Sequence, residues 1–265
     1  MTSRRIAVIP IHDEAATLAA VLEDVDPQVD FFILVDDGSK NGSADIAREL
    51  QRRRPGVWFL RHPGNRGMAQ ALKTGFCFAA RLLEEGLLQP DDIVINIDAD
   101  GQHPVYEIPR AAARMDADGL DLLLVVRDFS LYPRYKVLGN RLLTALARAV
   151  SGFPYRDVES GFRFLRVRCL PLLLPYFTGW RYSCAQEIAI ITSLLGGLRI
   201  ANDHLVRINY YRPGTTLMDG FAVLVMSLFS WLRVRISWRS SPEDARRHLA
   251  DVIIESPPTL LAGRS

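Results

Sequence analysis

Two aspartates, Asp98 and Asp100, stand two positions apart directly after a largely apolar run at residues 92–97. Paired carboxylates repel each other unless a cation lies between them. Oxygen ligands suit Mg²⁺ or Mn²⁺, which commonly bind through one or two carboxylates together with substrate phosphates. The pattern predicts a divalent-cation site. The alternative for this motif in isolation is a turn that aspartate caps.

A second acidic pair, Asp36 and Asp37, follows the apolar run at residues 31–35 and precedes Gly38. These carboxylates either form an Asx-type turn at a helix entry or accept hydrogen bonds from a base or ribose, and the residues alone favour neither. No GxGxxG motif follows the first apolar run, and the sequence has no GxxxxGK(S/T) motif. Dinucleotide-binding and P-loop sites are therefore not favoured.

The elements that must position these residues alternate along the first half of the chain. Short apolar runs separated by amphipathic segments are typical of parallel strands that helices cover on both faces. Ligands bind at the carboxyl ends of such strands, so the acidic residues are expected to meet at one edge. The predicted strands are residues 6–9, 31–35, 57–60, 92–97 and 122–126, and the predicted helices are 14–24, 43–53, 67–85 and 106–115.

The second half of the chain has a different pattern. We predict helices at 137–150, 185–195 and 217–231, and short strands at 162–165, 198–201 and 205–208. An apolar stripe on the last helix, with arginines after it, is formed by Leu217, Phe221, Leu224, Leu228 and Trp231. The stripe predicts either an interfacial membrane helix with a basic flank or a helix packed on the domain or in a dimer.

Length and composition limit the possible number of domains, the partners and the cellular compartment. The 265 residues suit one large α/β domain or one domain with a small appendage. The net charge of +2 gives no argument for a nucleic-acid partner. The three cysteines are far apart and form no CxxC pair, which indicates a reduced, cytosolic setting. No uninterrupted apolar stretch reaches the roughly 18–20 residues of a membrane span.

Further motifs follow in order along the chain and extend the two acidic pairs. Together they resemble glycosyltransferase family 2, which has the GT-A fold. They are most similar to the polyprenyl-phosphate glycosyltransferases, the group that includes dolichyl-phosphate mannose synthase. The resemblance covers about residues 6–216. Its motifs are residues 9–14 (IPIHDE), 35–39 (VDDGS), 65–67 (NRG) with 71–75 (ALKTG), 98–104 (DADGQHP), Arg127, Asp157 with 160–163 (SGFR), and Arg212 with Gly214.

The resemblance implies an α/β fold of GT-A type, a mostly parallel sheet flanked by helices. It places a catalytic domain at residues 1–216 and a C-terminal amphipathic helical extension at 217–265. The nucleotide-sugar donor would contact Pro10, Ile11, Glu14, Asp36, Asp37, Asn65, Gly67, Asp98, Ala99 and Arg212. Mg²⁺ or Mn²⁺ would be held by Asp98, Asp100 and Gln102.

For the acceptor, the resemblance implies a bound phosphate. Its ligands would be Arg127, Lys136, Asn140, Ser160 and Arg163, and the catalytic residues would be Asp100, Arg127 and Asp157. Where relatives carry an arginine followed four residues later by a serine, this chain has Lys136 and Asn140, and lysine lacks the bidentate guanidinium. Three structural alternatives stay open: Arg163 bridges to Asp157, Glu187 is a buried structural partner, and His103 is a turn residue.

The resemblance implies a metal-dependent, inverting glycosyltransferase that moves a hexose from a UDP- or GDP-sugar to an undecaprenyl- or dolichyl-type polyprenyl phosphate. An anionic acceptor needs no strong base, whereas a hydroxyl acceptor would need one, for which Asp157 is the candidate. The alternatives are a family member that glycosylates a saccharide or another hydroxyl acceptor, a nucleotide-sugar-binding or scaffold protein without turnover, and a nucleotidyltransferase.

We expect a cytoplasmic protein that is peripheral at the inner face of the cytoplasmic membrane. The expected partners are the nucleotide-sugar donor, the polyprenyl-phosphate lipid and a membrane surface. A second copy of the chain or a membrane protein is a further candidate, and nucleic acid is not expected.

Overall fold

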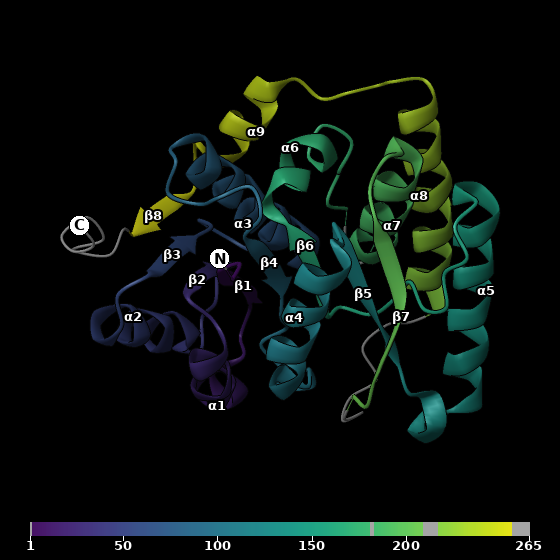
Figure 1. The fold of residues 1–265 in the computed structure, drawn as a ribbon. Helices are drawn as coiled ribbons and strands as arrows, with labels where there is room; N and C mark the ends of the chain where they lie inside the picture. Colours follow the sequence, from purple (N-terminus) through teal and green to yellow (C-terminus); the bar gives the residue numbers. More distant parts are fainter. Residues whose placement is uncertain (1, 181–182, 209–216, 256–265) are drawn as a thin grey trace.

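Eight strands form one sheet in the order β7-β5-β6-β4-β1-β2-β3-β8 (Figure 1). The computed structural model describes residues 2–180, 183–208 and 217–255. The strands are β1 (Arg5–Ile11), β2 (Phe31–Asp36), β3 (Val57–Arg61), β4 (Ile93–Asn96), β5 (Leu122–Arg127), β6 (Arg163–Arg166), β7 (Ile200–Val206) and β8 (Ile253–Glu255). All five strands predicted in the first half of the chain are confirmed.

The sheet is parallel in its centre and mixed towards its ends. Strands β4, β1, β2 and β3 pair in parallel with one another, as do β5 and β7. Strand β6 is antiparallel to both β4 and β5, and β8 is antiparallel to β3. The mostly parallel sheet of the predicted α/β fold is therefore confirmed.

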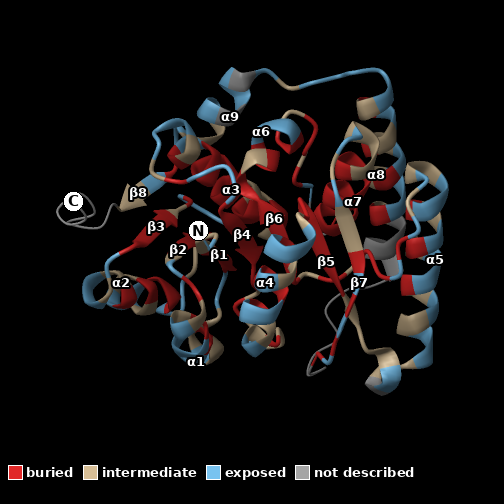
Figure 2. Ribbon diagram, viewed as in Figure 1, coloured by how far each residue is buried: buried red, intermediate tan, exposed pale blue. Residues whose placement is uncertain are grey.

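Helices cover both faces of the sheet because successive strand residues point to opposite sides. On β1, for example, Val8 packs into a core with α3, α6 and α7, whereas Ala7 and Ile9 pack into a core with α1, α2 and α4. Figure 2 shows the buried residues concentrated in the strands and on the helix sides that face them. These helices are α1 (Ala15–Val25), α2 (Ser43–Arg53), α3 (Met68–Glu84), α4 (Ile108–Asp118), α6 (Leu170–Leu173) and α7 (Cys184–Leu195).

One prediction for the second half is wrong. Two short strands were expected at residues 198–201 and 205–208, but the structure has the single strand β7. The polar residues 202–204 suggest a turn in the sequence, yet they continue the strand because their side chains have partners. The Asn202 amide donates to the carbonyl oxygens of Leu124 and Asp157, both at 3.0 Å, and His204 bonds Glu107.

The C-terminal segment joins the same body. Helix α8 (Leu217–Arg235) packs against α7 and α5 (Arg134–Ser151), and these three helices lie side by side at the β5–β7 end of the sheet (Figure 1). Helix α9 (Pro242–Leu249) then packs on α3, and β8 extends the sheet beyond β3. The sequence prediction missed α9, although Ser241 and Asp244 form a capping box at its start. The predicted boundary at residue 216 lies outside the described residues.

Candidate functional site

The predicted donor residues come together because neighbouring parallel strands end at one edge of the sheet. Ile11 in β1 is paired with Asp36 in β2, and the amide of Asp37 donates to the Ile11 carbonyl at 2.7 Å. On the other side of β1, the amide of Ile97, just after β4, donates to the Val8 carbonyl at 3.1 Å. The turn that carries Asp98 therefore leaves the sheet beside the end of β1.

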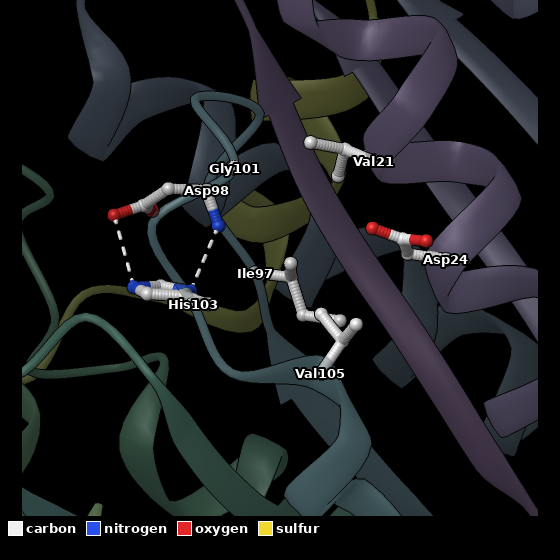
Figure 3. Close-up of a pocket in the computed structure, with 7 residues that line it drawn as sticks. All are labelled: Val21, Asp24, Ile97, Asp98, Gly101, His103 and Val105. Carbon is white, nitrogen blue, oxygen red and sulfur yellow. Dashed lines mark hydrogen bonds and ion pairs between the residues drawn. The ribbon is translucent and has the colours of Figure 1, made fainter. Parts of the chain in front are cut away.

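Asp98 is held by His103 (Figure 3). The Asp98 amide donates to His103 Nδ1 at 3.1 Å, and His103 Nε2 lies 3.3 Å from Asp98 Oδ2. Because Nδ1 accepts, the ring carries its proton on Nε2, the nitrogen that faces the Asp98 carboxylate. The Asp98 side chain is 35% exposed, whereas that of His103 is only 6% exposed. His103 is therefore more than a turn residue: it orients a predicted cation ligand.

A small cavity lies behind this pair. It opens between the Asp98 turn and helix α1, and Figure 3 shows Val21 and Asp24 of α1 on its far side. Its lining residues are Val21, Asp24, Ile97, Asp98, Gly101, His103 and Val105.

Asp100 is bonded to Gln102, the third predicted metal contact. The Gln102 amide nitrogen donates to Asp100 Oδ2 at 2.5 Å, and its backbone amide donates to Asp100 Oδ1 at 3.0 Å. Within the described ranges, no three or more His, Cys, Asp or Glu side chains are grouped so that they could hold a metal ion.

A hydroxyl links the end of β1 to the same turn. Thr17 Oγ1 lies 2.8 Å from the Ala99 carbonyl oxygen and 3.1 Å from Glu14 Oε2. Glu14 precedes α1, while Pro10 and Ile11 are buried in β1. The structure therefore brings Pro10, Ile11, Glu14 and Ala99 to one region, as expected for residues of one site.

Both carboxylates of the second acidic pair are buried and bonded to protein groups. Asp36 accepts from the Ser39 amide at 3.2 Å, an Asx-type contact, and from Arg61 Nε at 3.1 Å. Asp37 accepts from His62 Nδ1 at 2.6 Å and from the amides of Arg66 and Gly67 at 2.8 and 2.7 Å. Burial alone would raise the pKa of Asp37, but the hydrogen bond from His62 and the two amide bonds lower it below its ordinary value. Asp37 therefore organises the loop after β3.

Two histidines that the sequence prediction left unassigned belong to this region. His12 Nδ1 lies 2.9 Å from the Asp37 carbonyl oxygen, and its Nε2 lies 2.7 Å from Asn65 Nδ2, so this ring connects the ends of β1, β2 and β3. The second is His62, which bonds the Asp37 carboxylate. The sequence signal that was available is position, because both histidines lie within three residues of the end of a predicted strand.

Close approach of backbones makes glycine necessary at position 38. Gly38 has φ +72°, and a Cβ there would lie 2.7 Å from the carbonyl carbon of Gly64. No L-residue with a side chain fits that contact without moving the backbone. The turn after β2 and the loop after β3 are therefore packed directly on each other.

On the other side of the sheet centre, Arg127 at the end of β5 is paired with Asp157. Arg127 Nε and Nη2 donate to the two carboxylate oxygens of Asp157 at 2.7 and 2.9 Å, and Nη2 also donates to Asn140 Oδ1 at 2.8 Å. Burial alone would lower the pKa of the Arg127 guanidinium, but the charge and hydrogen bonds of Asp157 raise it above its ordinary value. Arg127, Asp157 and Asn140 thus form one bonded unit, and Lys136 lies one turn earlier on α5.

The remaining acceptor residues lie against the Asp98 turn. Arg163 Nε donates to the Ser160 carbonyl at 2.7 Å, so the alternative in which Arg163 bridges to Asp157 is wrong. Arg163 Nη1 and Ser160 Oγ are buried without a hydrogen-bond partner in the described part of the chain. A Cβ on the intervening Gly161 would lie 2.8 Å from Asp98 Oδ2.

Two further residues named from the sequence, Glu187 and Arg212, differ in outcome, and a third, Glu159, was not predicted. Glu187 is a buried structural partner: it accepts from Thr178 Oγ1 and from the Thr178 amide, both at 2.7 Å. Glu159, which the prediction did not name, is half-buried beside Ser160, and burial raises its pKa. Arg212 lies outside the described residues.

Comparison with known proteins shows which family the chain is similar to. The model of the family described as Glycosyl transferase family 2 matches residues 6–180. The chain is 26% identical over 202 residues to the UDP-N-acetylglucosamine–dolichyl-phosphate N-acetylglucosaminyltransferase of Methanococcus voltae, covering 69% of this chain and 78% of that protein. It is 27% identical over 177 residues to the polyprenol monophosphomannose synthase of Mycolicibacterium smegmatis, covering 62% of each.

A solved structure supports the fold. The glucosyl-3-phosphoglycerate synthase of Mycobacterium tuberculosis, crystallised with Mn²⁺ and UDP-glucose, superposes with a TM-score of 0.60 at 20% identity. The match covers 90% of this chain and 81% of that one. The GT-A fold expected from the sequence is confirmed.

Proposed function

The chain belongs to glycosyl transferase family 2, and we propose that it moves a hexose from a nucleotide-diphosphate sugar to a polyprenyl phosphate. It is a glycosyltransferase, as the family and the fold indicate. The choice of acceptor is supported by relatives that are named for dolichyl and polyprenol phosphates, together with the charge and burial of the side chains around Arg127 and Arg163.

The donor side is proposed to lie at the ends of β1, β2 and β4. Pro10, Ile11 and Glu14, with Asn65 and Gly67 of the loop that Asp37 organises, would line the nucleotide pocket. Arg212 would add a positive charge to the donor phosphates. Asp36 and Asp37 would act by holding this pocket in shape, because both carboxylates are bonded to protein groups.

Asp98, Asp100 and Gln102 would hold Mg²⁺ or Mn²⁺. Two carboxylates and one amide offer the oxygen ligands that these cations prefer, and the Asp98 carboxylate is partly exposed. When bound, the cation would neutralise charge that develops on the leaving diphosphate. His103 keeps Asp98 in place, and Gln102 does the same for Asp100 through its backbone amide.

The observation that carries the acceptor assignment is the buried, unpartnered Arg163 Nη1 beside Ser160 Oγ, within the described residues. A buried cationic donor without a partner is costly, and a phosphate oxygen would satisfy it. The unit of Arg127, Asp157 and Asn140 would present arginine donors near this phosphate, and Lys136 would add positive charge. Asp157 is poorly suited to act as a base because Arg127 binds both its oxygens, whereas a lipid phosphate is already anionic.

A membrane surface is the proposed location, at the inner face of the cytoplasmic membrane. No helix within the described ranges is long and apolar enough to cross a bilayer. Helix α8 buries Val223 and Ser227 against the domain, yet Leu224, Leu228 and Leu232 on its other side are 38%, 44% and 43% exposed. Exposed leucines of this kind, followed by arginines, suit insertion into the headgroup region of an anionic bilayer.

The test incubates the full chain with radiolabelled UDP- and GDP-hexoses, Mn²⁺, and either undecaprenyl or dolichyl phosphate. We expect label to enter the organic phase, and we expect EDTA or Asp100→Asn to abolish the transfer. Label that stays in water on an added saccharide would instead support a hydroxyl acceptor. Absence of any donor turnover across all donors would contradict the assignment.

A further inference from the structure

A buried chain of hydrogen bonds leads from the donor side of the sheet to the C-terminal helix. His62 Nδ1 lies 2.6 Å from Asp37 Oδ1, and His62 Nε2 lies 2.8 Å from Thr74 Oγ1 on α3. The same Thr74 oxygen lies 2.8 Å from Nε2 of His248 on α9. Asp37, His62 and Thr74 are at most 2% exposed, and His248 is the member that comes from outside the predicted catalytic domain.

A second contact ties the same two regions together. Arg66, in the loop after β3, forms an ion pair with Asp251, which lies between α9 and β8. Strand β8 then pairs with β3, whose end leads into that loop. The segment from Ser241 to Glu255 therefore reaches the loop at residues 62–67 directly through Asp251 and indirectly through His248 and Thr74.

These hydrogen bonds hold the loop at residues 62–67 through a series of partners. The amides of Arg66 and Gly67 are held by Asp37, Asp37 is held by His62, and His62 is held by Thr74. Thr74 has a single hydroxyl proton, so its two histidine partners must be complementary: it donates to one and accepts from the other. Because Asp37 accepts from His62 Nδ1, Thr74 donates to His62 Nε2 and accepts from His248 Nε2. Loss of His248 therefore leaves the Thr74 oxygen without its donor and weakens the bond from Thr74 to His62.

We propose that His248 is a positioning residue through which the C-terminal segment at residues 241–255 holds the loop at residues 62–67 in its donor-binding conformation. The donor role of the loop rests on the proposed function. A segment that served only to cover α3 would need apolar contacts alone, whereas a buried polar chain is sensitive to the position of every member. Burial lowers the pKa of His248 to about 4, as do the charges of Lys73 and Arg66, so the ring links the two regions without adding charge.

The test compares His248→Ala and His248→Gln with Arg247→Ala in the full chain. Arg247 is the matched control because it is the neighbouring residue of α9 and its side chain is 75% exposed. The first measurement is residue-resolved hydrogen exchange at the amides of Arg66 and Gly67. The second is the affinity for UDP and for GDP, each with Mn²⁺.

We expect His248→Ala to speed exchange at both amides and to weaken nucleotide binding about fivefold, the factor given by one lost hydrogen bond of about 1 kcal/mol. His248→Gln is expected to restore most of both properties because its amide can bond Thr74. Under saturating donor, kcat should stay within about twofold of wild type, so the effect falls on the donor KM.

Unchanged exchange at Arg66 and Gly67 in His248→Ala would overturn the proposal. So would an equal effect in Arg247→Ala. If His248→Ala folds poorly, His248→Leu replaces it, since leucine fills much of the space of the ring but cannot donate to Thr74. Failure of the proposed function is distinguishable: wild-type protein would then bind neither nucleotide, while the exchange result would still report the coupling.

Discussion

The guanidinium of Arg127 and the carboxylate of Asp157 form a two-point ion pair, with Nε and Nη2 donating at 2.7 and 2.9 Å. The Asp157 side chain has no exposed surface, and Arg127 is 17% exposed. Asp157 also accepts from the Glu159 amide at 3.1 Å, so its oxygens are occupied by protein donors. The pair presents one fixed arginine at the end of β5.

Breaking this pair should cost stability. Asp157→Asn leaves the Arg127 charge buried and uncompensated, so the free energy of unfolding should fall by about 3 kcal/mol in urea denaturation. Glu85→Gln is the control, since it removes an exposed ion pair with Arg81 and should cost no more than about 0.5 kcal/mol. Equal losses of unfolding free energy in the two variants would show that the buried pair stabilises the protein no more than the exposed one.

Removing the His103 ring should weaken metal binding. His103→Leu loses both contacts to Asp98, so the affinity for Mn²⁺ in the presence of UDP or GDP should fall about ten- to a hundredfold, the usual effect of losing a residue that orients a metal ligand. Titration calorimetry or electron paramagnetic resonance of Mn²⁺ measures this affinity. Tyr106→Ala, three residues further and 66% exposed, should bind as wild type. Unchanged affinity in His103→Leu would refute the orienting role.

A methyl group at position 161 should disturb the same carboxylate. In Gly161→Ala the added Cβ would lie 2.8 Å from Asp98 Oδ2 and 3.0 Å from His103 Nε2, so transferase activity should fall at least about tenfold. Gly139→Ala on α5 is the control, because its Cβ meets nothing within 4 Å. It should keep full activity and gain about 1 kcal/mol of stability from helix propensity.

The stability of the protein should depend on pH through His248. Its pKa is lowered from 6.5 to about 4, so between these values the unfolded chain binds a proton that the folded chain does not. Stability should therefore fall as pH drops through this window, and this contribution should be constant above it. Denaturation curves of wild type and His248→Gln should differ in this dependence by about 2 kcal/mol between pH 6.5 and 4. If the free energy of unfolding changes with pH in the same way in both proteins, the lowered pKa of His248 is contradicted.

Membrane binding should depend on the exposed side of α8. Replacing Leu224, Leu228 and Leu232 by serine removes apolar surface worth about 1 kcal/mol per residue, so partition into anionic vesicles should weaken more than about a hundredfold. Leu205→Ser, at a 63% exposed position on the edge strand β7, is the control in the flotation assay. Equal flotation of the triple variant and the wild type would count against the membrane proposal.

The sequence by itself determined the five strands of the first half of the chain, their mostly parallel arrangement and the edge at which the polar residues gather. Apolar runs such as residues 6–9 and 31–35 are typical of buried strands, and amphipathic helical connections of about a dozen or more residues favour parallel neighbours. The ordered motifs around Asp36, Asp98 and Ser160 resemble those of the family whose model matches residues 6–180.

Only the tertiary structure decided how these side chains are paired. The partner of Asp157 is Arg127 at the end of another strand, and His103 and His62 take their roles from Asp98 and Asp37. Contacts between distant segments leave no periodic signal in a single sequence, as with Thr74 of α3 and His248 of α9, which are 174 positions apart. The same holds for the polar residues of β7: hydrogen-bond partners from distant segments outweigh local propensity, and those partners exist only once the chain has folded.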